Sequence, residues 1–160
     1  MRLPDGFDPA ERGERARGYF QEGYNCCQAV LMAFSDVVDA DAELLKTIGS
    51  GFGGGFGRMR EVCGAFSGCT VMAGFLCPAT ETGQESRAAN YALVQDLATA
   101  FRERNGGSII CGELLGLRER RAEGPTPSER TAEYYKKRPC PEIVRNAAVL
   151  VAEKMKEAAR

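Results

Sequence analysis

The sequence predicts an all-α fold, a single-domain helical bundle of five to seven helices. Apolar residues recur at intervals of three and four along most of the chain, which is the spacing of one helix face. Capping and stop residues flank these segments, and the one strand candidate, Ile109-Ile110, is short and isolated. A chain of 160 residues suits one domain with its own core, so we expect a single helical domain over residues 1–160.

The first and third helices are expected from their terminal residues. Asp8 caps a helix that has Pro9 in its first turn and stops at Gly23. Its many charged residues predict a solvated face. A short helix is expected over Asp41–Ile48, ending at Gly49.

The second helix carries a cysteine doublet at its start. Asn25 is expected to cap it, and Gln28 completes a capping box. Cys26 then takes the first helical position, where free N–H groups and the positive dipole end stabilise a thiolate. Cys27 belongs to the apolar stripe, and which of the two sulfurs does chemistry stays open. The stripe is Cys27, Val30, Leu31, Phe34, Val37 and Val38.

The segment 49–76 contains the helix around which the rest of the fold is expected to pack. In it, a glycine-rich run leads into an apolar helix that begins at Cys63. Gly64 and Gly68 fall on one face of that helix, and each glycine costs about 1 kcal/mol there relative to alanine. We therefore expect another backbone or a ligand to approach this face closely. The helix is predicted to be central, with Cys69 on its buried stripe.

The glycine run also contains a formal G-x-G-x-x-G match over residues 49–54. No strand precedes it and no acidic residue follows about twenty positions on, so a dinucleotide site is rejected. We expect a loop that lies against a sulfur site and donates N–H groups to it, or otherwise a flexible connector. Arg58 and Arg60 precede Cys63 and are expected either to favour its thiolate or to be solvated.

A long helix is expected in the second half of the chain. Cys77-Pro78 ends the preceding helix, and Thr82 with Glu85 makes a capping box for the next. Its apolar stripe is Ala89, Leu93, Leu97 and Phe101, and it stops at Asn105. Residues 116–129 are the most loop-like region.

Two more cysteines are placed near helix starts. With Ser108 as the cap, Cys111 takes the third position of a short helix. Cys140 is expected to cap the last helix, with Pro141 in its first position and a basic run over residues 136–138 beside it. Core cysteines have no reason to prefer helix starts, whereas a site collecting negative sulfur charge does.

The cysteine pattern resembles a known family. Asn25-Cys26, then Cys63-Gly64-Ala65-Phe66-Ser67-Gly68, then single Cys111 and Cys140, look like the redox-active family C_GCAxxG_C_C over about residues 15–145. In this chain Cys63 precedes Gly64, the reverse of the order in the family's name. The resemblance implies a small cytoplasmic helical redox protein in which these four cysteines act together. It also implies an iron–sulfur association and an oxidoreductase or other electron-transfer partner.

Three chemistries use four such cysteines. They are an iron–sulfur cluster on four thiolates, dithiol–disulfide exchange, and a structural zinc site. In the dithiol alternative, Cys63 is expected to attack and Cys26 or Cys111 to resolve. A helical scaffold without redox chemistry is a fourth alternative. The seven cysteines exclude a fully paired disulfide framework, and the absence of histidine excludes Cys-His nucleophiles and mixed Cys/His zinc sites.

Composition limits partners and location. The 21 basic and 22 acidic residues nearly cancel, so no nucleic-acid footprint is predicted. The longest apolar run is too short to span a bilayer and no signal-peptide pattern opens the chain, so neither membrane insertion nor export is expected. We expect a cytoplasmic protein, whose thiols are reduced, catalytic or metal-bound. Whether it is an enzyme and whether it forms a homo-oligomer stay open.

Overall fold

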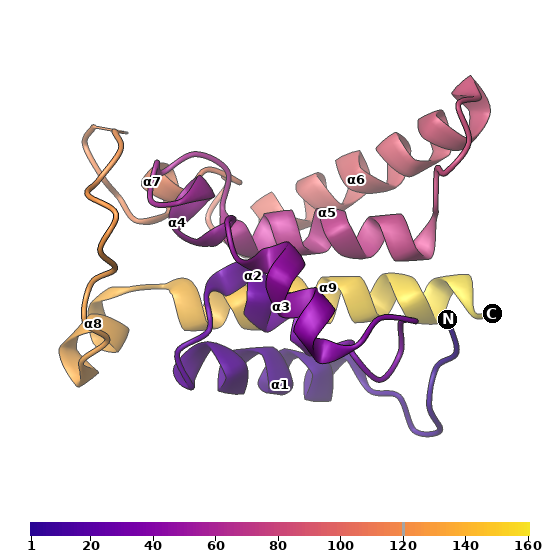
Figure 1. Ribbon diagram of the computed structural model, residues 1–160, viewed down its shortest axis with the longest axis horizontal. Coiled ribbons are helices and arrows are strands. Elements are labelled where there is room, and N and C mark those ends of the chain that lie inside the picture. Colours follow the sequence, from indigo (N-terminus) through magenta and orange to yellow (C-terminus); the bar gives the residue numbers. More distant parts are fainter. Residues whose placement is uncertain (120) are drawn as a thin grey trace.

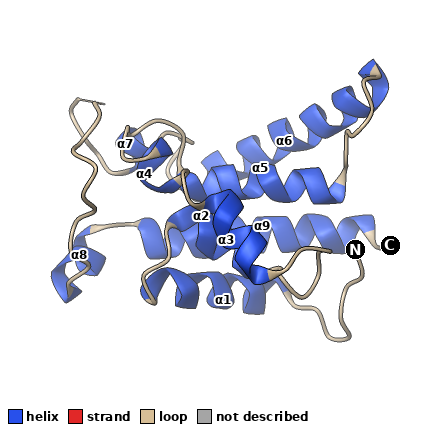
Figure 2. Ribbon diagram, viewed as in Figure 1, coloured by secondary structure: helices blue, strands red, loops and turns tan. Residues whose placement is uncertain are grey.

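The computed structural model describes residues 1–119 and 121–160 and is mostly helical, as predicted (Figure 2). No β-strand is present in these residues; Val62 and Ile110 form an isolated antiparallel bridge. The helical segments outnumber the expected five to seven because several are very short. They are α1 (Pro9–Gln21), α2 (Cys26–Met32), α3 (Ala42–Gly49), α4 (Gly53–Phe56), α5 (Gly64–Leu76), α6 (Gln84–Arg104), α7 (Cys111–Leu114), α8 (Ala132–Lys137) and α9 (Cys140–Ala158).

The long helices pack in layers around one apolar core. Helix α1 runs along α9, and α5 contacts α2, α6 and α9 (Figure 1). The short elements α4, α7 and α8 gather toward one end of the molecule (Figure 1). The core contains large side chains that are fully buried, among them Leu31, Phe34, Met72, Phe101 and Val151. Burial of such side chains is the main stabilising contribution.

Most of the expected helix starts are confirmed. Asp8 accepts a hydrogen bond from the Ala10 N–H, and Asp41 caps α3. The Asn25 side chain accepts from the Gln28 N–H, and the Gln28 side chain accepts from the Asn25 N–H, which is the predicted capping box.

The start of α6 differs from the prediction. Gly83, not Thr82, is its N-cap, and no side-chain cap hydrogen bond forms there, so the Thr82–Glu85 capping box is wrong. Ala89 is exposed because the N-terminal end of α6 splays away from α5 (Figure 1). Leu97 and Phe101 are buried as expected, whereas Leu93 is only half-buried.

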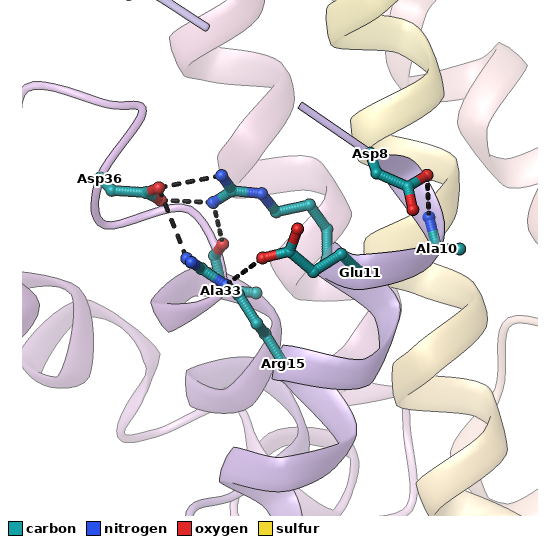
Figure 3. A network of polar contacts seen from close by, with 7 residues as sticks. Asp8, Ala10, Glu11, Arg15, Ala33 and Asp36 are labelled. Atoms are coloured by element: carbon teal, nitrogen blue, oxygen red, sulfur yellow. Dashed lines mark hydrogen bonds and ion pairs between the residues drawn. The ribbon is translucent and has the colours of Figure 1, made fainter. Parts of the chain in front are cut away.

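The charged face of α1 is only partly solvated. Arg12 is 3% exposed, and its guanidinium donates to the Ala33 carbonyl at 2.9 Å and to both carboxylate oxygens of Asp36. Arg15 lies 3.4 Å from the same carboxylate (Figure 3). The buried charge is tolerated because it is paired and hydrogen-bonded, and the network fixes α1 to the turn after α2.

No helix among the described residues has the length and apolarity needed to cross a membrane.

Candidate functional site

The four cysteines predicted to act together all line one cavity of about 710 Å³. Cys26 is the first residue of α2 and Cys63 is the N-cap of α5, as expected. Cys111 is the first residue of α7, not the third, because Ile110 rather than Ser108 is the N-cap. The expected cap at Cys140 is wrong: Pro139 is the N-cap of α9, so Cys140 takes the first helical position and Pro141 the second. All four therefore stand at helix starts facing a common space.

Backbone pairing between two short segments places Cys63 beside Cys111. The Cys63 N–H donates to the Ile109 carbonyl at 2.8 Å, and the Cys111 N–H donates to the Glu61 carbonyl at 2.6 Å. These bonds flank the Val62–Ile110 bridge. The isolated strand candidate thus has a structural role, since it joins two cysteines that are far apart in the sequence.

Two glycines of α5 let this helix lie against α2, confirming the expected close approach. A Cβ atom on Gly64 would overlap the Cys26 sulfur and lie 2.8 Å from the Phe52 carbonyl oxygen. A Cβ atom on Gly68 would lie 2.9 Å from Val30 Cβ. Only glycine fits at these contacts.

The loop between α3 and α5 has a strongly left-handed backbone. Gly54, Gly55 and Gly57 have positive φ, and so do Phe56, Arg58 and Arg60, at 62°, 67° and 58°. Such a conformation costs a non-glycine residue about 1–3 kcal/mol. The backbone N–H of Gly54 donates toward the Cys26 sulfur. The expected loop against a sulfur site fits these contacts better than a flexible connector.

Gly55 completes that loop on the side of Cys111. A Cβ atom at Gly55 would lie 2.7 Å from the Cys111 Cβ and 2.6 Å from the Glu61 nitrogen. The loop backbone therefore lies in direct contact with two of the four cysteines.

The two arginines of this loop, Arg58 and Arg60, interact with Cys111 and Glu123 and not with Cys63, contrary to the prediction. Arg60 is buried, donates to the Cys111 sulfur at 3.5 Å and pairs with the Glu123 carboxylate. Arg58 lies 3.2 Å from the same carboxylate, and the Glu123 N–H donates to the Arg58 carbonyl at 3.0 Å. Glu123 carries no local sequence signal, because its partners lie about sixty positions earlier.

The thiols in the cavity are strongly desolvated. Burial raises the pKa of Cys26, of Cys63 and of Cys140, the last to about 12. Charge on Cys26 raises the pKa of Cys63 and Cys140 further, while the N–H groups of Phe66 and Ala65 act in the opposite direction at Cys63. Without a cation to offset their mutual repulsion, these thiols are protonated at neutral pH.

The other three cysteines do not line this cavity. Cys27 is fully buried on the core side of α2, and its burial raises its thiol pKa. Cys69 is buried as expected, donates toward the Ala147 carbonyl at 3.6 Å, and has a pKa raised to about 12 by burial. Cys77 ends α5 and is half-buried. The structure thus places Cys26, not Cys27, on the cavity.

A further wall of the cavity escaped the sequence analysis. This wall is formed by α8, by the residues just before and after it, and by the described part of the predicted loop 116–129. Arg120 of that loop lies outside the described residues. Arg130 stacks on Phe20 at 4.1 Å and donates to the Phe20 carbonyl. Arg138 lies over the Tyr134 ring at 5.4 Å. Pro125 and Pro127 also line the cavity.

The side chains in the cavity determine whether a single metal ion or a cluster fits there. The four thiols share one cavity, and no histidine or carboxylate is among the described residues that line it. Over the described residues, no three cysteine, aspartate or glutamate side chains are grouped as the ligands of a metal ion would be. A polynuclear cluster spreads its four cysteines over two or more iron atoms, so its ligands surround a volume instead of meeting at a single ion. Four thiols around a cavity fit that arrangement.

Fold and site together define a small all-α protein in which four cysteines, brought from distant helices, share one cavity. The chain belongs to the family described as "Putative redox-active protein (C_GCAxxG_C_C)", whose model matches residues 24–154. The family description indicates redox activity, in agreement with the resemblance in the cysteine pattern. No curated protein and no solved structure matches the chain.

Proposed function

We propose that this protein transfers electrons through an iron–sulfur cluster held by Cys26, Cys63, Cys111 and Cys140. The observation that carries the proposal is that four cysteines, widely separated in the sequence, line one cavity from four helix starts. When bound, such a cluster supplies a reversible one-electron couple whose potential depends on charge, hydrogen bonds and solvent exposure.

The protein groups around the sulfurs support ligation by thiolates. N–H groups of Gly54, Ala65 and Phe66 donate toward Cys26 and Cys63, and the Arg60 guanidinium donates to Cys111. Each of these donors stabilises negative charge on sulfur. Apolar residues such as Ala65, Ile143 and Val144 also line the cavity and lower the polarity around the sulfurs.

A structural zinc site is a weaker alternative. Four thiolates bind zinc with all sulfurs about 2.3 Å from one ion. Here the cysteines lie on four separate elements around a cavity of about 710 Å³, far larger than one ion needs. The packed core also supplies stability without a metal.

The dithiol alternative is favoured by one contact. The Arg60 guanidinium donates a hydrogen bond to the Cys111 sulfur at 3.5 Å. In this alternative Cys111 is the attacking cysteine, in place of Cys63, and Cys63 resolves, because backbone pairing holds the two residues side by side.

We further propose a single domain over residues 1–160, with the α5 helix of Cys63 as the centre of the bundle. Its contacts with α2, α6 and α9 support that arrangement. Thiol ligands persist in a reducing compartment, which supports a cytoplasmic location. The electron partner is proposed to be an oxidoreductase.

The test is anaerobic reconstitution with iron and sulfide, followed by iron analysis and visible spectroscopy. The wild type is expected to gain a chromophore, and Ser substitution at any of the four cavity cysteines is expected to weaken or abolish it. Cys77→Ser is the control, because Cys77 is half-buried and does not line the cavity. Wild-type protein that takes up no iron but forms a reversible Cys63–Cys111 disulfide would establish the dithiol alternative.

A further inference from the structure

The wall of the cysteine cavity is strongly basic. Four arginines line it, and no aspartate or glutamate does among its described lining residues. The carboxylate of Glu123 pairs with Arg58 and Arg60, which we call the inner arginines. The outer arginines, Arg130 and Arg138, form no ion pair within the described part of the chain.

The outer arginines are held in place but keep free hydrogen-bond donors. Arg130 uses one N–H on the Phe20 carbonyl and stacks on the Phe20 ring. Arg138 stacks over Tyr134, and its side chain donates to no acceptor in the described residues. A guanidinium has five donors in a fixed fork, so both groups retain donors that match a carboxylate or a phosphate.

A buried N–H group of an inner arginine also lacks a hydrogen-bond acceptor. The Nε atom of Arg58 is buried and has no hydrogen-bond partner in the described residues, and Arg58 lines the cavity. A buried donor without an acceptor costs about 1–3 kcal/mol. An anionic group in the cavity would provide acceptors for donors of this kind.

Apolar side chains line the rest of the space. Phe20, Leu115, Pro127 and Ile143 are among them. A volume of about 710 Å³ falls in the range of small-molecule sites, which are apolar cavities with a few convergent polar groups. The cavity therefore suits a molecule with an anionic head and an apolar body.

We propose that the outer arginines Arg130 and Arg138 bind the carboxylate or phosphate head of a small organic anion beside the cysteines. The apolar body of the ligand lies against Leu115 and Pro127, which line the same cavity and are at least partly exposed. This site deepens the proposed function, and it depends on that function only for the redox role of the neighbouring cysteines. It makes the protein a binder of a small organic anion as well as an electron carrier.

The test is titration calorimetry with three probes of one shape: phenylacetate, phenyl phosphate and neutral phenylacetamide. Both anions, or one of them, are expected to bind the wild type, and the two anions distinguish a carboxylate from a phosphate ligand. Each outer arginine changed to Gln is expected to weaken binding about tenfold, the equivalent of one charge-assisted hydrogen bond. Arg102→Gln, on the exposed face of α6, is the matched control and is expected to bind like the wild type.

A second readout separates this site from the cluster. The Arg130→Gln/Arg138→Gln double variant is expected to lose anion binding and keep the chromophore after reconstitution. If the double variant loses both anion binding and the chromophore, these arginines only offset the charge of the cluster, and the proposed anion site is wrong. Equal binding of phenylacetamide, unchanged binding by the double variant, or no heat from either anion would also overturn it. Anion binding by protein that takes up no iron would leave this site standing and refute the cluster alone.

Discussion

Gly64 and Cys26 meet where α5 crosses the start of α2, so closely that a Cβ atom on Gly64 would overlap the Cys26 sulfur. The glycine therefore sets how near the N-terminus of α5 lies to the cavity cysteines.

Gly64→Ala is expected to destabilise the fold by about 1–3 kcal/mol, because the added methyl forces α5 away from α2. It is also expected to reduce iron uptake, since Cys63 moves with the helix. Urea unfolding and reconstitution measure the two effects. Gly74→Ala is the control on the same helix: no atom lies within 4 Å of the added carbon, so it is expected to stabilise by up to about 1 kcal/mol. Equal stability of the two variants would contradict the contact.

Glu123→Gln is expected to expose Cys111. The carboxylate holds Arg58 and Arg60 and so fixes the segment 121–130 over the cavity. Its loss is expected to increase alkylation of Cys111 by iodoacetamide several-fold, as followed by mass spectrometry of labelled peptides. Glu119→Gln, whose ion pair with Arg121 is fully on the surface, is expected to leave the rate unchanged. An unchanged rate in Glu123→Gln would show that the ion pair does not hold the segment.

Asp36 is expected to make stability pH-dependent in acid. The Arg12 hydrogen bond lowers the pKa of Asp36 below its ordinary value of 3.8. A carboxylate with a lowered folded-state pKa stabilises the protein above the unfolded pKa, and this stability is lost as pH falls through the folded pKa. Asp36→Asn is expected to cost about 1 kcal/mol at neutral pH, since Asp36 is partly exposed, and to flatten the acid limb. Urea midpoints measured from about pH 2 to 6 test this, and Asp5→Asn, at an exposed aspartate, is the control. If the stability of Asp36→Asn falls in acid as steeply as that of the wild type, other carboxylates cause the loss of stability.

Iron uptake is expected to rise with pH. Burial raises the pKa of Cys26, Cys63 and Cys140, so each thiol must release a proton before it binds a metal. Anaerobic reconstitution at about pH 6, 7.5 and 9 is expected to show faster growth of the chromophore at each higher value. Proton release measured in weak buffer should accompany uptake. A rate independent of pH would mean that these sulfurs are not the ligands that bind first.

The sequence alone determined those features that depend on neighbours within a few positions. The Asn25–Gln28 capping box, which puts Cys26 at a helix start, and the start of α3 after Asp41 follow from such local hydrogen bonds. Cys63 stands at the start of α5 without a side-chain cap hydrogen bond, and its placement follows from the point where the apolar stripe begins. The helical class and the burial of Cys69 follow from periodicity, which is also local.

Tertiary structure decided what depends on contacts between distant segments. It directed Arg60 to Cys111 and Glu123 instead of to Cys63, because the left-handed loop turns that side chain away from its neighbour in the sequence. It also brought Arg130 and Arg138 to the cavity by packing α8 and its flanks against α1. No periodicity or spacing records such contacts, since the residues that meet are chosen by how the helices pack and not by their order in the chain.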